Sequence, residues 1–72
     1  MLNAMPKIEL IVNGRKSETG AQTLAALLDE QELSDAKVAT ALNGHFVPAA
    51  KRDTTNLKAG DSVEIVSARQ GG

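Results

Sequence analysis

The end of the chain could do chemistry without any reactive side chain. Its last four residues are Arg69, Gln70, Gly71 and Gly72, and the last of them carries the terminal carboxylate. Two glycines have no side chains, so such a segment is slim enough to extend through a narrow channel into another protein's active site. A carboxylate becomes an acylating group once an enzyme converts it to a mixed anhydride, for example with AMP. The alternative is a frayed end without function, because terminal residues of domains are commonly disordered.

The remaining residues offer little for catalysis. The 72 residues include no cysteine and one histidine, His45. The chain therefore lacks a thiol nucleophile, a disulfide and sulfur ligands for a metal, and one histidine cannot make a metal cluster. The glycines of the body, Gly14, Gly20, Gly44 and Gly60, are isolated, so no glycine-rich loop could cradle a phosphate. We predict a protein that is not an enzyme, has no catalytic residue, metal site or cofactor, and relies on a partner for ATP.

Charge and composition argue against several classes of partner. The chain has 8 Lys and Arg against 9 Asp and Glu, so it lacks the basic excess of nucleic-acid-binding proteins. Its one aromatic residue, Phe46, gives no platform for stacking bases. The longest apolar run, residues 24–28, is far too short to span a bilayer, and residues 1–6 lack the pattern of a signal peptide. We expect no nucleic-acid partner, no membrane partner and a cytoplasmic location.

Strand and turn signals alternate along the body of the chain. Asn13-Gly14 and Asn43-Gly44 each predict a hairpin, because both central residues of a type I′ turn need a positive φ. Leu57 is the expected buried anchor of segment 49–58, which is otherwise predicted to be irregular. Alternating or β-branched residues predict strands at 7–12, 15–19, 38–42, 46–47 and 62–66.

One helix is expected between the two hairpins. Thr23 is the predicted N-cap, and Leu24, Leu27 and Leu28 share one face at helical spacing. Such a leucine face is typical of core rather than of a binding groove. Two hairpins and one helix predict a small α+β domain in which the helix covers one face of a mixed sheet. If the first and last strands are neighbours, their apolar positions meet beneath the helix.

Body and tail together resemble one family. The ordered set consists of residues 38–44, Val47-Pro48, Leu57, Gly60-Asp61, residues 63–66 and Gly71-Gly72. It is similar to the ThiS family of thiamine-biosynthesis sulfur carriers, over residues 7–72. The resemblance implies a ubiquitin-like β-grasp fold with a mixed sheet of four to five strands and one main helix. We accordingly expect an extension at residues 1–6, a domain at 7–66 and a flexible tail at 67–72.

The same resemblance implies a mechanism centred on the tail. A ThiF-like adenylating enzyme would activate Gly72, and a sulfur donor would supply the atom that replaces one carboxylate oxygen. The thiocarboxylate would then be delivered to a ThiG-like thiazole synthase, while Gly71, Gln70 and Arg69 form the slim tail. Three alternatives stay open: a molybdopterin-type carrier, a protein modifier that forms isopeptide bonds through Gly72, and an interaction module with an inert tail.

Partners of β-grasp carriers are expected on the sheet face away from the helix. Alternation places Ile11 and Val66 on that face. Phe46 either joins them or fills the core. A small exposed apolar patch is typical of a reversible interface, so these three residues are the predicted partner-binding residues.

Overall fold

Five strands, one α-helix and one 3₁₀ helix form the part of the chain that the structure describes. The structure is a computed structural model, and it describes residues 6–34 and 36–67. In chain order the elements are β1 (Ile8–Val12), β2 (Arg15–Thr19), α1 (Leu24–Glu30), β3 (Val38–Leu42), β4 (His45–Val47), the 3₁₀ helix η1 (Ala49–Thr54) and β5 (Ser62–Ser67).

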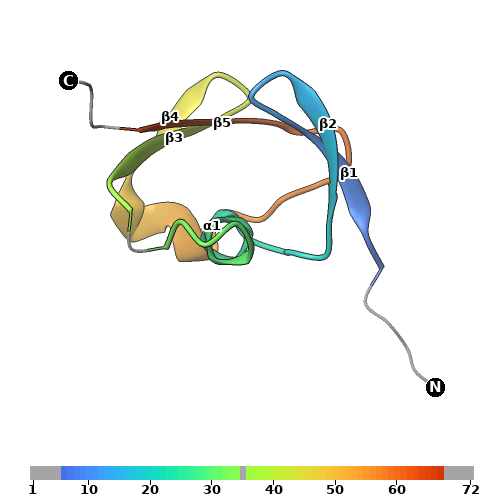
Figure 1. Ribbon diagram of the computed structural model, residues 1–72, viewed down its shortest axis with the longest axis horizontal. Helices are drawn as coiled ribbons and strands as arrows, with labels where there is room; N and C mark the ends of the chain where they lie inside the picture. Colours follow the sequence, from blue (N-terminus) through green and yellow to red (C-terminus); the bar gives the residue numbers. More distant parts are fainter. Residues whose placement is uncertain (1–5, 35, 68–72) are drawn as a thin grey trace.

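The strands make one mixed sheet in the order β2-β1-β5-β3-β4. The hairpins β1–β2 and β3–β4 are antiparallel, and β5 lies between them, parallel to β1 and antiparallel to β3. Figure 1 shows α1 and η1 together on one side of this sheet. The first and last strands are therefore neighbours, which the sequence had left open, and the predicted α+β architecture with the helix on one face is confirmed.

Both hairpins turn where the sequence predicts. Asn13 and Asn43 each have a φ of 51°, and the glycines after them have φ values of 82° and 86°. Positive φ at both central positions matches the right-handed twist of the flanking strands. These two turns set the registers of β1–β2 and β3–β4, and with them the face on which each side chain lies.

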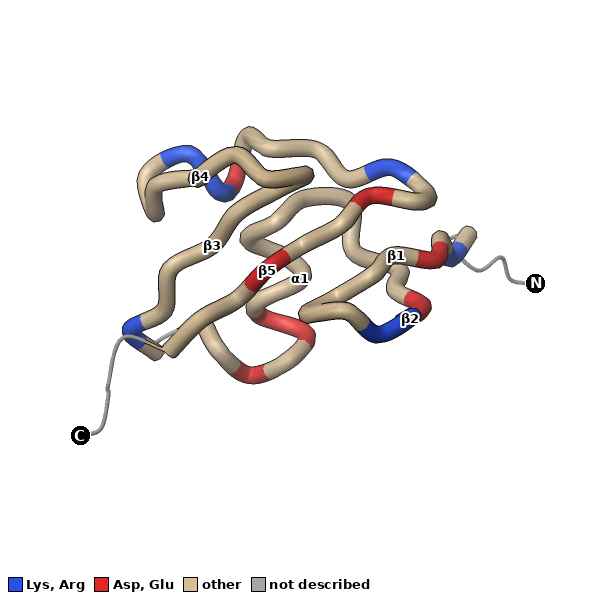
Figure 2. Tube along the Cα trace, turned by 90° about the horizontal axis from the view of Figure 1, so that it is seen from above, with Lys and Arg blue, Asp and Glu red and all other residues tan. Residues whose placement is uncertain are grey.

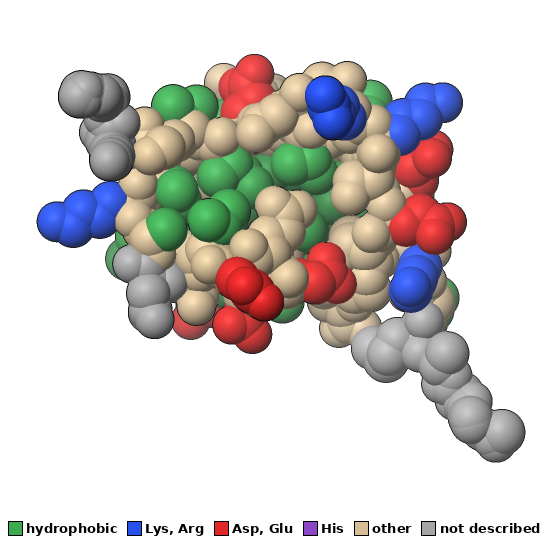
Figure 3. Space-filling model, viewed as in Figure 1, with side chains coloured by type: hydrophobic (Ala, Val, Ile, Leu, Met, Phe, Trp, Pro, Cys, Tyr) green, Lys and Arg blue, Asp and Glu red, His purple; other side chains and the backbone are tan. Residues whose placement is uncertain are grey.

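The core lies between α1 and the sheet. Thr23 caps α1 as predicted, since its side-chain oxygen accepts from the Ala26 N–H at 3.1 Å. The leucine face of the helix is buried against residues of β1, β4 and β5. The buried cluster consists of Leu10, Leu24, Leu27, Val47, Leu57 and Val63. Figure 3 shows hydrophobic side chains gathered in the middle of this side, between the sheet and α1.

Segment 49–58 departs from the irregular structure that the sequence predicts. Pro48 ends β4, and the next six residues form η1, in which the Lys51 N–H donates to the Pro48 carbonyl at 2.9 Å. None of the residues of η1 is buried, so its sequence lacks the hydrophobic periodicity from which a helix can be predicted. The buried anchor Leu57 is confirmed at 8% exposure. β5 runs to Ser67, one residue further than expected.

Candidate functional site

The sheet surface that faces away from α1 is the outer face, and strand alternation decides which residues lie on it. Leu10 and Val63 point toward α1 and are fully buried. Successive side chains of a strand point to opposite faces, so Ile11 on β1 and Val66 on β5 lie on the outer face. On β4, Val47 is buried in the core and its neighbour Phe46 therefore points outward.

Three large hydrophobic side chains are exposed on this face. Ile11, Phe46 and Val66 leave 37%, 69% and 61% of their surface accessible. They are the three residues that the sequence predicts to bind partners. The sequence left open whether Phe46 joins Ile11 and Val66 on the outer face or fills the core. Its exposure shows that it lies on the outer face.

Two alanines join Phe46 to Val66 across β3. Phe46 pairs with Ala41, and Val66 pairs with Ala39. Paired residues on neighbouring strands lie side by side on the same face, so the four residues form one continuous apolar surface. We call Ala39, Ala41, Phe46 and Val66 the apolar patch. The two alanines were not predicted to belong to the site, although their alternation with buried Thr40 in β3 was a signal for them.

Ile11 is separate from the apolar patch. It pairs with Ser62, which lies four residues before Val66 on β5. At about 3.3 Å per residue this places the two roughly 13 Å apart along the strand. Glu64 stands between them on the outer face, next to Ala41. Figure 2 looks onto this face and shows the acidic residue of β5 near its centre.

The outer face carries more acidic than basic residues. Its strand positions include Glu9, Glu18 and Glu64 against one lysine, Lys16. Glu9 pairs directly with Glu18, and like charges in directly opposite positions of a sheet are destabilising. A cationic group of a partner placed over this pair would relieve that repulsion. The outer face therefore combines the apolar patch on β3, β4 and β5 with an acidic residue beside it, Glu64, and an acidic pair on β1 and β2.

The tail begins beside the apolar patch. β5 ends at Ser67, directly after Val66, and Ser67 pairs with Val38 of β3. The predicted tail residues Arg69, Gln70, Gly71 and Gly72 lie outside the described residues. Because Val66 is the last outer-face residue of β5, a protein that covers the apolar patch is placed next to the start of the tail.

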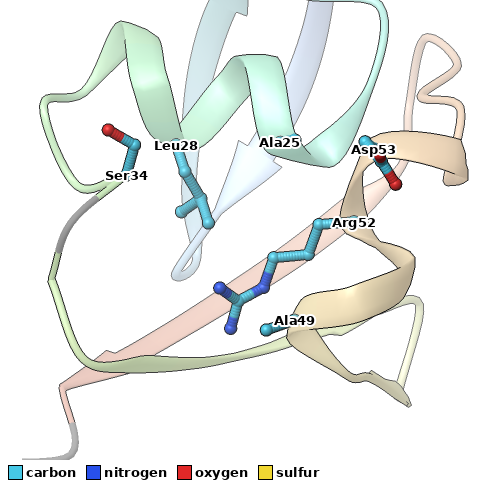
Figure 4. Close-up of a pocket in the computed structure, with 6 residues that line it drawn as sticks. All are labelled: Ala25, Leu28, Ser34, Ala49, Arg52 and Asp53. Atoms are coloured by element: carbon cyan, nitrogen blue, oxygen red, sulfur yellow. The ribbon is translucent and has the colours of Figure 1, made fainter.

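A pocket of about 300 Å³ lies on the opposite side of the sheet, between α1 and η1. Figure 4 shows the Arg52 side chain extending from η1 into it, with Asp53 pointing away. Arg52 donates from Nε to the Thr40 hydroxyl at 3.0 Å and from Nη2 to the Val38 carbonyl at 2.7 Å. Through these two bonds the arginine ties η1 to β3, so its role in the pocket is structural.

Residues 6–34 and 36–67 hold neither a cluster of metal-binding side chains nor a helix that could cross a membrane. That part of the chain holds no group of three or more His, Asp or Glu side chains that could bind a metal ion. His45 is exposed at the start of β4. None of the helices in the same residues is long and apolar enough to cross a membrane.

The strand order, together with the one α-helix of the described residues on the sheet face opposite the outer face, defines a ubiquitin-like β-grasp domain. Comparison with known proteins agrees. The family model described as the ThiS family matches residues 9–72, so the chain belongs to the ThiS family. A crystal structure of the thiamine biosynthesis protein ThiS from Geobacter metallireducens is similar, with 33% identity and a TM-score of 0.75. The match covers 90% of this chain and 100% of that one. A search of curated proteins found no match.

Proposed function

We propose that the protein is the sulfur carrier for the thiazole part of thiamine, a carrier rather than a catalyst. The observation that supports this most is that the family match runs through residue 72 and so includes the Gly71-Gly72 end. The similar solved protein is named for thiamine biosynthesis. The lack of cysteine fits as well, because sulfur must then be held at a group other than a thiol.

The proposed chemistry takes place at the carboxylate of Gly72. A ThiF-like enzyme supplies ATP; the carboxylate attacks the α-phosphorus, and pyrophosphate leaves. A sulfur donor then provides a nucleophilic sulfur, which replaces AMP at the carbonyl carbon and leaves a thiocarboxylate. A ThiG-like thiazole synthase takes the sulfur from it: the C–S bond breaks, and an oxygen atom from the synthase's substrate or from water takes its place and restores the carboxylate. This chain contributes a slim tail and a surface that both enzymes recognise.

The outer face is the proposed docking surface for both enzymes. It holds the exposed side chains of Phe46 and Val66, and Val66 lies next to the start of the tail. A partner that fits would carry an apolar depression for the apolar patch and basic groups for Glu64 and the Glu9–Glu18 pair. Two enzymes that use one face bind in turn, and a small apolar patch suits such reversible contacts.

Intact-mass analysis tests the proposal. The purified protein is incubated with its adenylating enzyme, ATP and a sulfur source, and the expected result is the mass gain of one oxygen replaced by sulfur. A variant lacking Gly72 serves as the control and should show no gain. No gain in the wild type, or an equal gain in the truncated variant, rejects the carrier function.

Two further measurements separate the alternatives. Thiocarboxylated protein is offered to thiazole synthase and to molybdopterin synthase, and the synthase that consumes the sulfur identifies the pathway. Cells that express a tagged protein are searched for lysine conjugates. Conjugates that disappear when Gly72 is deleted would identify a protein modifier instead, and a function that survives the deletion would identify an interaction module.

A further inference from the structure

A single side chain completes the pairing of β1 with β5. The two strands pair at only two positions, Ile11 with Ser62 and Val12 with Val63. The chain then enters its turn at Asn13, whose backbone N–H donates to the Val63 carbonyl at 2.9 Å. Its side chain continues from there: Oδ1 accepts from the Ile65 N–H at 2.8 Å, and Nδ2 donates to the Ile65 carbonyl at 3.1 Å. The Asn13 amide thus acts as one more residue of β1.

The second hairpin asparagine makes an analogous contact at the other end of β5. Asn43 Oδ1 accepts from the Ser62 N–H at 2.9 Å, and its Nδ2 donates to Asp61 Oδ1 at 3.0 Å. Asn13 and Asn43 share a φ of 51°, and each is followed by glycine. They are chemically matched, and they differ in which end of β5 they hold.

We propose that Asn13 is a positioning residue for the reactive tail, an inference that rests on the proposed function. Its amide satisfies both backbone groups of Ile65, the residue before Val66 and two before the end of β5. Without that amide, both backbone groups of Ile65 lose their partner, and a strand segment with fewer hydrogen bonds opens more easily. Asn13 therefore helps to hold the last part of β5, from which the tail continues, in its place in the sheet.

The consequence for function is a binding cost. An enzyme that receives the tail must order a loosened strand end before its active site can reach Gly72, and ordering flexible segments on binding weakens affinity. The chemical step, which takes place at the carboxylate, is unchanged once the tail is seated. Loss of the Asn13 amide should therefore raise KM for the carrier and leave kcat as it is.

The test compares Asn13→Gly with Asn43→Gly in the full chain. Glycine adopts the positive φ without strain and keeps the type I′ turn, so each change removes one side-chain amide and little else. Hydrogen exchange should show the Ile65 amide losing about tenfold or more of its protection in Asn13→Gly, because its acceptor is gone. In Asn43→Gly the loss should fall on the Ser62 amide and spare Ile65.

Adenylation kinetics with a ThiF-like enzyme and ATP then test the role itself. Asn13→Gly should raise KM about fivefold or more at constant kcat, since the tail must be ordered on binding. Asn43→Gly, compared at the same folded fraction, should match the wild type. If Asn13→Gly does not fold, Asn13→Asp takes its place: its carboxylate can accept from Ile65 but cannot donate, and its KM must exceed the wild-type value.

The outcomes separate this role from the function on which it rests. An adenylated wild type with equal KM values for the two glycine variants overturns the positioning role and leaves the carrier function standing. A lower kcat at unchanged KM in Asn13→Gly overturns it too. A wild type that the adenylating enzyme does not activate overturns the carrier function and, with it, the role of Asn13.

Discussion

Replacing Phe46 with alanine separates docking from folding. Phe46 is 69% exposed, while its neighbour Val47 makes the core contact of β4. Its partner on β3 is Ala41, so the truncation removes a cross-strand contact with a small residue. Effects of this kind on sheet stability stay within about 1 kcal/mol. The urea midpoint should therefore change little, and a change in partner affinity can be assigned to the docking surface.

The expected loss of affinity follows from the exposed area. An aromatic side chain buries about 150–250 Å² when it is fully covered. Roughly two thirds of that area is still available on Phe46, and at about 25 cal/mol per Å² its burial contributes about 2.5–4 kcal/mol. Aromatic residues at the centre of an interface lose about 2 kcal/mol or more on truncation. We expect Kd to rise about 30-fold or more.

Titration calorimetry with the adenylating enzyme and with thiazole synthase measures this effect. Lys51→Ala is the matched control, because Lys51 is exposed on η1, on the opposite side of the sheet from the outer face. It should bind both enzymes as the wild type does. A Phe46→Ala variant that stays folded and binds both enzymes within about threefold of the wild type would refute the outer face as their docking surface.

Two further substitutions test which contacts stabilise the folded domain. Leu27→Ala removes a side chain with no exposed surface, and we expect a loss of about 2–5 kcal/mol in urea unfolding, out of about 4–11 kcal/mol for a chain of this length. A loss below about 1 kcal/mol would contradict its place in the core. Arg52→Met removes the bonds to Thr40 and Val38, and we expect a loss of about 1–3 kcal/mol, whereas exposed Lys51→Met should change nothing. Equal urea midpoints for the two methionine variants would show that the ties from η1 to β3 do not stabilise the fold.

The elements with local signals were predictable from the sequence. Each Asn-Gly pair specifies its turn because of the φ values that the turn demands, and Thr23 specifies the start of α1 through its own side-chain bond. The 3₁₀ helix η1 was missed for an equally physical reason. None of its residues is buried, and its tie to β3 runs through Arg52 to residues more than ten positions away. A sequence pattern cannot register a bond of that kind.

The sequence predicted the three large hydrophobic residues of the candidate site, but neither the two alanines of the apolar patch nor the arrangement of these residues. Alternation assigns Ile11 and Val66 to the outer face, but the short apolar run Phe46-Val47 gives no phase, which left Phe46 undecided. The separation of Ile11 from Val66 depends on the register of β1 against β5. That register is formed between residues about fifty positions apart, and so is the contact of Asn13 with Ile65.

The same long-range strand register explains why the carrier needs a folded domain in addition to its tail. On the proposed function, the reactive carboxylate stands at the end of the tail, and the five residues after Ser67 can reach at most about 18 Å when extended. An enzyme must therefore hold the end of β5 within that distance of its active site. Val66 belongs to the apolar patch and lies next to the end of β5. An enzyme that binds the apolar patch therefore also holds the point from which the tail starts. A change that loosens this strand end, such as loss of the Asn13 amide, should then weaken binding to the enzyme although no residue of the tail is altered.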